Sequence, residues 1–303
     1  MLKHTLFIAG LTIGSVSLAN QGAHALNYSW PLYVADYQSK KIYNFSQAGT
    51  KSTFANNVND MHGMAFDKSG NLFVADGVDG NIYKFTPQGV QSTFASGLSG
   101  VNGLAFDGSG NLYANRYSNG TIYKFTSGTR VAFVTGLSRI NDALAFDASG
   151  NLFVGSGLNT IYKFDSNGQN KITFATGLNN ISYLAFDSSG NLFEADYGSG
   201  KINKFDPAGN RSTFASGLNS PTSLAFDYMG NLFESDAGSN SIIEFNSTGT
   251  ARTTFASGLN YPQTLAFQGT SVPFEFSPEQ GFILGIPLFL GLRKLKSKKG
   301  VQK

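Results

Sequence analysis

The 303-residue chain contains no cysteine and only one tryptophan, and charged residues make up just 14% of it. Without thiols, the chain can form neither a disulfide framework nor a thiolate metal site. It also lacks an HExxH helix, a Walker loop, a dinucleotide-binding fingerprint and a Ser-His-Asp arrangement. These absences leave no support for a zinc protease, a nucleotide-binding enzyme or a serine hydrolase of the common types.

An excess of positive charge is also absent from the middle of the chain. The whole chain has a formal net charge of +3, but residues 26–269 hold 15 lysines and arginines against 17 aspartates and glutamates. The basic excess therefore comes from the C-terminal end. Because no basic stripe remains to neutralise phosphates, the sequence predicts that nucleic acid is not a partner.

What the chain does have is a repeat of 40 residues. The segment D-x-x-G-N-L-F/Y recurs with its glycine at Gly70, Gly110, Gly150, Gly190 and Gly230. A degraded sixth copy, WPLYVADY, begins at Trp30. A fixed period of this length is the signature of a repeat architecture, and it favours one repeat domain over two ordinary domains.

Each repeat contains four short apolar segments separated by turns rich in glycine and asparagine. In one repeat they are residues 71–76 (NLFVAD), 81–85 (NIYKF), 91–95 (QSTFA) and 103–107 (GLAFD). Four strands at a spacing of about ten residues form an antiparallel meander, which is the blade of a β-propeller.

The ends of the repeat region indicate how the ring closes. Six Leu/Met-Ala-Phe strands occur, but none precedes the first strands at 32–36 and 41–45, and no GNLF follows the last one at 265–267. If the last strand joins the first three, no sheet edge is left open. The sequence thus predicts an all-β, six-bladed β-propeller of 40-residue, four-stranded blades over residues 26–271.

The repeat resembles those of the NHL and SMP-30/gluconolactonase-like propellers. Their unit reads approximately P-x-G-L-A-x-D-x-x-G-N-L-Y-V-A-D, which is close to the segment from Pro221 to Asp236. The resemblance covers residues 30–269 and implies the propeller fold. It implies no single function, because these groups include enzymes, ligand-binding proteins and scaffolds.

The N-terminus has the pattern of a secretory signal peptide. Lys3 precedes an apolar run at residues 6–19, and Ala23-His24-Ala25 forms a cleavage signal of the A-x-A type. We therefore expect residues 1–25 to be removed on export. His62 would then be the one histidine of the mature chain.

Residues 272–303 combine a short motif, an apolar stretch and a basic cluster. The motif contains Pro273, Phe274 and Glu275, the apolar stretch covers residues 281–292, and lysines and arginines follow it. An apolar stretch shorter than about 20 residues that ends in basic residues indicates membrane retention or sorting rather than a full span.

These three parts, in this order, resemble the C-terminal sorting signals of PEP-CTERM proteins in their PFE variant. The resemblance implies an exported bacterial protein whose tail is processed near the motif by an exosortase-like membrane enzyme. It also implies a location in the cell envelope or extracellular matrix, with at least transient anchoring in the membrane through the C-terminal segment.

Nine of the 19 acidic residues recur at two equivalent positions of the repeats. Five open a turn whose glycine needs a positive φ, and we interpret them as turn residues because DxSGN has too few ligands for a calcium loop. They are Asp67, Asp107, Asp147, Asp187 and Asp227. Four others end the second strand of a repeat and are interpreted as loop caps: Asp36, Asp76, Asp196 and Asp236.

Positions that differ between repeats are better candidates for a site. One polar column lies just before the Leu-Ala-Phe strands, at one mouth of the expected channel: His62, Asn102, Asp142, Ser182, Thr222 and Gln263. In a second column, Glu194 and Glu234 replace the valine or alanine of the other repeats. Because an unpaired carboxylate on a buried strand is costly, we expect both to point into the channel or to pair with a neighbour.

The gluconolactonase-like resemblance implies a divalent cation at this mouth. Asn102 and the pair Asn141-Asp142 look like the asparagine and aspartate ligands of that family, and oxygen donors suit Ca²⁺. The family's glutamate beside the first blade has no counterpart in LNYSWPLYVAD, so Glu194 or Glu234 would have to replace it. His62 with either glutamate and magnesium would be the arrangement of streptogramin lyases, whereas one histidine cannot form a paraoxonase-like dyad.

Two functions remain open from the sequence. The first is an exported, monomeric, non-catalytic propeller that binds glycans or proteins, which the nearly identical repeats and the sorting tail favour. The second is a divalent-metal-dependent lactone hydrolase or lyase, with Asn102, Asp142, Glu194 and Glu234 as metal ligands.

Overall fold

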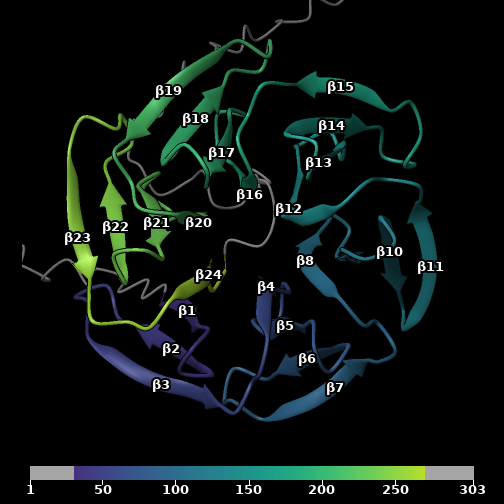
Figure 1. The fold of residues 1–303 in the computed structure, drawn as a ribbon. Coiled ribbons are helices and arrows are strands. Elements are labelled where there is room, and N and C mark those ends of the chain that lie inside the picture. The colour runs from purple at the N-terminus through teal and green to yellow at the C-terminus, as the bar shows by residue number, and fades with distance from the viewer. Residues whose placement is uncertain (1–30, 270–303) are drawn as a thin grey trace, which may run out of the picture.

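The computed structural model describes residues 31–269, which form 24 β-strands in six four-stranded sheets. The sheets stand around a central axis as the blades of a propeller (Figure 1). This confirms the predicted all-β, six-bladed architecture. The predicted signal peptide (residues 1–25) and the C-terminal signal with Pro273, Phe274 and Glu275 lie outside the described residues. Residues 31–269 contain no helix that is long and apolar enough to cross a membrane.

The blades are numbered here from the N-terminus, and in each the strand nearest the axis is given first. Blade 1 comprises β24 (Pro262–Phe267), β1 (Leu32–Asp36), β2 (Lys41–Phe45) and β3 (Lys51–Asn56). Blade 2 comprises β4 (Met61–Phe66), β5 (Leu72–Asp76), β6 (Asn81–Phe85) and β7 (Gln91–Ala95). Blade 3 comprises β8 (Val101–Phe106), β9 (Leu112–Arg116), β10 (Thr121–Thr126) and β11 (Thr129–Val134).

The remaining three blades follow the same order. Blade 4 comprises β12 (Ile140–Phe146), β13 (Leu152–Ser156), β14 (Thr160–Phe164) and β15 (Ile172–Ala175). Blade 5 comprises β16 (Ile181–Phe186), β17 (Leu192–Asp196), β18 (Lys201–Phe205) and β19 (Arg211–Ser216). Blade 6 comprises β20 (Pro221–Phe226), β21 (Leu232–Asp236), β22 (Ser241–Phe245) and β23 (Arg252–Ala256).

The ring closes in blade 1, as the sequence predicted. Strand β24 pairs antiparallel with β1, and Leu32 lies opposite Phe267 in the register. The pairing continues beyond the strands, since the Gln268 N–H donates to the Pro31 carbonyl at 3.3 Å. The last strand therefore completes a sheet begun by the first three strands of the chain, which leaves no unpaired strand edge beside the axis.

The two faces of the ring differ in what they present. We call the face at which the innermost strands begin the mouth, and the opposite face, which carries the D-x-x-G turns, the turn face. His62 lies at the start of β4 and is therefore at the mouth. Both ends of the described chain lie at the turn face, because β1 begins there and β24 ends there.

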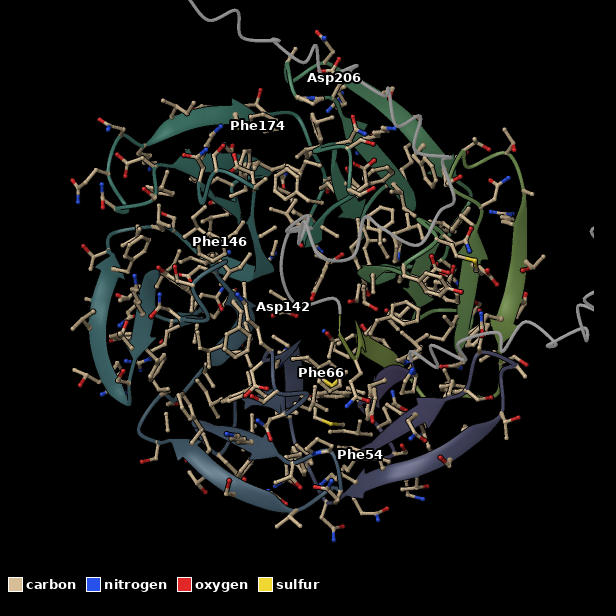
Figure 2. All side chains as sticks on the ribbon, turned by 180° about the vertical axis from the view of Figure 1, so that it is seen from behind. Phe54, Phe66, Asp142, Phe146, Phe174 and Asp206 are labelled. Atoms are coloured by element: carbon tan, nitrogen blue, oxygen red, sulfur yellow. The ribbon has the colours of Figure 1, made fainter. Side chains whose placement is uncertain are left out.

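Aromatic side chains fill the space between neighbouring sheets. Phe54 and Phe66, which Figure 2 labels, both pack edge-on against Tyr33, with ring centroids 4.9 Å away in each case. Phe146 and Phe174 occupy related positions in later blades, where they contact Tyr113 and Phe153. Edge-to-face packing of this kind suits the ring quadrupoles, and its repetition around the axis holds the blades together.

The turn aspartates organise the turn face. Asp67 Oδ1 accepts the N–H groups of Ser69 (2.9 Å) and Asn71 (2.8 Å), and its Oδ2 accepts from Asn71 Nδ2 (2.7 Å). The glycine between them, Gly70, has a φ of 77°. The same carboxylate-to-asparagine bonds occur in the other four turns. These five acids thus stabilise the turns.

The strand-end aspartates fix the loops at the mouth. Asp76 accepts the N–H of Asn59 (3.1 Å) through one oxygen and that of Asp79 (3.0 Å) through the other. Asp196 and Asp236 bind their loops in the same way. The mouth therefore rests on loops that are hydrogen-bonded to the ends of the strands, which favours a preformed binding site.

Candidate functional site at the mouth

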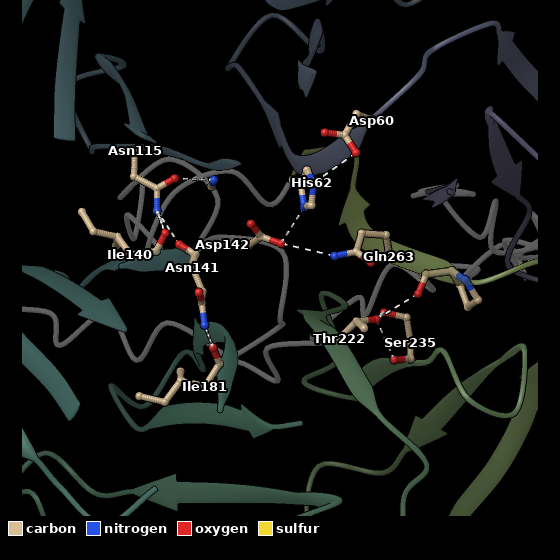
Figure 3. Close-up of polar contacts among 12 residues, drawn as sticks. Asp60, His62, Asn115, Ile140, Asn141, Asp142, Ile181, Thr222, Ser235 and Gln263 are labelled. Carbon is tan, nitrogen blue, oxygen red and sulfur yellow. Dashed lines mark hydrogen bonds and ion pairs between the residues drawn. The ribbon is translucent and has the colours of Figure 1, made fainter. Parts of the chain in front are cut away.

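Two residues of the polar column, His62 and Gln263, converge on the carboxylate of a third, Asp142, at the mouth. Asp142 Oδ2, on β12 of blade 4, lies 3.5 Å from Nδ1 of His62 on β4 of blade 2. Gln263 Nε2, on β24 of blade 1, donates to the same oxygen at 3.4 Å (Figure 3). Blades 1 and 4 are opposite each other in the ring, so Asp142 reaches toward the centre of the mouth (Figure 2).

His62 lies between two carboxylates. Its Nε2 is 3.3 Å from Asp60 Oδ1, and its Nδ1 faces Asp142. Burial disfavours the charged imidazolium, but the hydrogen bond to Asp142 and the charges of Asp142 and Asp60 outweigh it and raise the pKa of His62 to about 9. The cluster thus holds one cation between two anions near neutral pH.

The second oxygen of Asp142 is the most informative atom of the site. Asp142 Oδ1 is buried and has no hydrogen-bond partner within the described part of the chain. A buried carboxylate oxygen without a donor is unfavourable, whereas a ligand hydroxyl or N–H would satisfy it. An unsatisfied acceptor therefore lies at the centre of the mouth.

Three half-buried tyrosines extend this cluster along the mouth, and we call them the tyrosine arc: Tyr37, Tyr261 and Tyr197. The ring of Tyr37 is 6.2 Å from that of His62 and 6.1 Å from that of Tyr261. The hydroxyls of Tyr261 and Tyr197 are 3.4 Å apart. Burial, followed by the contact with Tyr197, raises the pKa of Tyr261 to about 12, so its phenol stays protonated.

Sequence reasoning missed the tyrosine arc, although one column carried a signal. The residues directly after the strand-end position are Tyr37, Gly77, Tyr117, Gly157, Tyr197 and Ala237. Large aromatic and small residues alternate there, which breaks the symmetry of the repeat. Tyr261 belongs to a different loop position, so no single column contains the whole arc.

Ser182 and Thr222 of the polar column, and Asn141 beside it, bind backbone carbonyls, one for each residue in the next blade. Ser182 Oγ donates to the carbonyl of Ala195 (3.0 Å) or Pro221 (2.7 Å), and Thr222 is bonded similarly. Asn141 Nδ2 donates to the Ile181 carbonyl at 2.9 Å, which links blade 4 to blade 5 (Figure 3). These polar groups are therefore committed to inter-blade contacts.

Asn115 makes the same kind of link and was not singled out from the sequence. It is fully buried on β9, where its Oδ1 accepts the Gly103 N–H at 2.6 Å and its Nδ2 donates to the Asn141 carbonyl. Asn102, half-buried on β8, lies beside these residues, and its backbone oxygen packs against Gly63.

Glu194 and Glu234 lie in the cores between blades. Both are fully buried, at positions equivalent to Val74 and Val154, which belong to apolar inter-blade clusters. Asn203 Nδ2 donates to Glu194 Oε2 at 2.8 Å, whereas both oxygens of Glu234 have no partner in the described chain. Burial raises the pKa of Glu194 to about 8 and that of Glu234 well above its usual range. Glu194 thus pairs with a neighbour, which is one of the two arrangements expected for these acids.

The structure does not bring the predicted metal ligands together. Within residues 31–269, no three His, Cys, Asp or Glu side chains are close enough to hold one ion. Asp142 points toward the axis, whereas Glu194 and Glu234 occupy inter-blade positions. Because Ca²⁺ requires about six to eight oxygen ligands, these residues as placed do not fit a calcium site.

The fold and the mouth define a six-bladed β-propeller with a polar and aromatic central face. No protein-family model matches the chain, and the curated proteins contain no match. Among solved structures, a chain from the crystal structure of a nidogen–laminin complex superposes with a TM-score of 0.71 at 21% identity, covering 78% of this chain and 98% of that one.

Two further propellers show the same similarity in fold. Virginiamycin B lyase from Staphylococcus aureus has a TM-score of 0.61 at 12% identity, with 80% of this chain and 89% of that chain covered. A protein of unknown function from Bacteroides caccae has a TM-score of 0.60 at 14% identity, with 79% and 99% covered. At these identities the likeness establishes the propeller fold that the chain shares with them.

Proposed function

We propose that the protein is an exported, non-catalytic binding propeller whose mouth recognises a glycan. The observation that carries this proposal is the buried, unpartnered Oδ1 of Asp142 at the point where His62 and Gln263 converge. A sugar offers neighbouring hydroxyls, one of which would donate to this oxygen while others meet the polar groups of His62 and Gln263.

The tyrosine arc supplies the second component of such a site. Sugar rings have apolar C–H faces, and aromatic rings with a polar tip pack against them while their hydroxyls bind to water or ligand. Tyr37 lies next to His62, and Tyr261 continues the surface to Tyr197. A few fixed polar groups beside aromatic walls are the usual composition of a small-ligand site.

The chain ends provide the context for this proposal. The N-terminal export pattern and the PEP-CTERM-like tail favour a location in the cell envelope or matrix, where glycans and surface proteins are the available ligands. The NHL and gluconolactonase-like pattern of the repeat is compatible with a binding role. A surface protein that carries the glycan is an equally suitable partner.

A glycan array with the full chain tests the proposal. We expect selective binding that is weakened about tenfold or more in the Asp142→Asn variant, because a charge-assisted hydrogen bond is lost while the shape is kept. Asp206→Asn is the matched control and should bind normally, because this half-buried turn acid follows β18 at the turn face and lies at the rim of the ring, away from Asp142 (Figure 2). An array without selective binding, or a profile unchanged by Asp142→Asn, would contradict the proposal.

The same array distinguishes the metal-dependent alternative. We expect binding to be equal in calcium and in a chelator, because the mouth acids do not form an ion site. If binding or lactone hydrolysis appeared with calcium alone and disappeared in Asp142→Asn, the hydrolase or lyase function would replace the binding function.

A further inference from the structure

Blade 6 departs from blades 2 to 5 at one position near the turn face, where blade 1 carries the neutral Asn44 opposite Tyr33. In blades 2 to 5, a lysine of the third strand lies opposite an aromatic residue of the second strand. These lysines hold their Nζ 5.0–5.5 Å from the centroid of that ring: Lys84, Lys124, Lys163 and Lys204. Each blade thus places an ammonium group over an aromatic face, which is a favourable cation–π arrangement.

Two of these lysines also reach the turn aspartate of their blade. Lys124 Nζ is 3.9 Å from Asp107 Oδ2, and Lys163 Nζ is 3.5 Å from Asp147 Oδ2. The ammonium group therefore lies between a ring and a carboxylate. The repeat thus shows that this position accommodates an ammonium group.

In blade 6 a carboxylate replaces the lysine. Glu244 is the residue opposite Phe233, and the turn acid of this blade is Asp227. Burial and the charge of Asp227 raise the pKa of Glu244 above its usual value. Two acids and a ring therefore remain where blades 2 to 5 also have a cation, and a carboxylate near the negative face of a ring is unfavourable.

The same place is a cleft. A hollow of about 60 Å³ lies at the seam between blades 6 and 1, and its lining includes Asp227, Glu244 and Phe233. Tyr228 and Met229 form an outer wall, with 52% and 55% of their surfaces exposed. The other four D-x-x-G turns have small or polar residues at these two positions.

We propose that this cleft binds a lysine side chain of another protein. The ammonium group would lie over Phe233 between Asp227 and Glu244, the position that the blade's own lysine takes in blades 2 to 5. The methylene stem would pack against Tyr228 and Met229, which gives a reason for two exposed apolar residues in a turn. Charge complementarity favours a basic partner segment over an acidic or neutral one.

This site is separate from the mouth, because it lies on the turn face at the opposite end of the axis. A propeller with both sites would hold a glycan at one face and a basic protein segment at the other. The lysine site rests on the cleft between blades 6 and 1 and uses no residue of the mouth, so it stands or fails independently of the glycan proposal.

The test is saturation-transfer NMR of the full chain with a short alanine peptide that carries one central lysine. We expect saturation of the lysine methylene signals, and none for the same peptide with norleucine. Glu244→Gln should weaken binding about tenfold, whereas Ala208→Lys, which changes the net charge by the same amount on exposed blade 5 surface, should have no effect.

A second variant tests the same site by supplying a lysine from the chain itself. Glu244→Lys restores the residue type of blades 2 to 5, so the new lysine should fill the cleft, abolish peptide binding and raise the melting temperature. The proposal is wrong if the lysine and norleucine peptides give equal signals, or if Glu244→Lys binds the peptide as the parent does. Binding that appears only after the lysines at 294, 296, 298 and 299 are changed to glutamine would make the chain's own tail the occupant, and would also overturn it.

Discussion

At the level of single residues, His62 is the group whose titration reports most directly on the mouth. Its pKa of about 9 lies above the 6.5 of an unperturbed histidine, because the charges of Asp142 and Asp60 outweigh the effect of burial. The folded state therefore binds this proton more tightly than the unfolded state. The resulting stabilisation is complete below about pH 6.5 and is lost as the pH rises through 9.

An NMR titration of the His62 ring signals tests this prediction. We expect a midpoint near 9 in the parent chain. The midpoint should be lower in Asp142→Asn, because this variant removes the carboxylate charge that lies 3.5 Å from Nδ1. A midpoint near 6.5 in both chains would mean that the His62–Asp142 contact does not form in solution.

Glu194 should also make the protein less stable as the pH rises, but for a different reason. Burial raises its pKa from 4.5 to about 8, so the folded state keeps a proton that the unfolded state releases between these values. Stability therefore falls as the pH rises through this range, and the loss is complete above about 8.

The Glu194→Gln variant removes this titration while leaving an amide oxygen for Asn203 Nδ2. We expect it to be more stable than the parent at pH 8 and nearly equal at pH 5, as measured by urea unfolding at both values. A difference that does not depend on pH would show that Glu194 is not protonated in the folded state.

At the level of elements, the D-x-x-G turns are the best-determined parts of the fold. Asp187 Oδ1 accepts the N–H groups of Ser189 and Asn191, and its Oδ2 accepts from Asn191 Nδ2. Asp187→Ala should cost about 1–3 kcal/mol in the free energy of unfolding, since three donors lose their acceptor at a half-exposed turn. Denaturant unfolding measures this cost.

Glycan binding by Asp187→Ala should stay unchanged, because the turn lies at the face opposite Asp142. Loss of binding without loss of stability would assign Asp187 to a site and contradict its role as a turn residue.

Strands and turns could be predicted because their determinants are local. Each blade repeats an apolar alternation and a turn with glycine at a positive φ, and ring closure followed from the absence of an inner strand before residue 32. The interpretation of Asp67 and its equivalents required only the residues within four positions along the chain.

The site could be predicted only in part, because its contacts cross the ring. Asp142 and His62 were found as symmetry-breaking residues, but their pairing joins blades 2 and 4, and Gln263 reaches the same oxygen from blade 1. Such contacts depend on side-chain reach across the axis. The pairing of Glu194 with Asn203 depends on the register of β17 and β18 in the folded sheet.

At the level of the whole molecule, closure of blade 1 should decide whether the ring folds cooperatively. Truncation after Asn260 removes β24, which leaves the inner edge of β1 unpaired and Leu32 without its partner Phe267. We expect the cooperative thermal transition to be lost, which circular dichroism would show. We also expect the chains to associate through the open edge, which size-exclusion chromatography would show.

Truncation after residue 271 is the matched control, because it retains every described strand. It should unfold in one cooperative transition as a monomer. Equal behaviour of the two truncations would show that β24 is not needed to close the ring.

The central claim is that the mouth of this propeller is its glycan-binding site. It is tested most directly by following the His62 ring signals while the full chain is titrated with the glycan selected on the array. We predict a saturable shift of these signals in the parent chain and in Asp206→Asn, and no shift at the same concentrations in Asp142→Asn. Binding that leaves the His62 signals unmoved would place the ligand elsewhere on the ring and contradict the account.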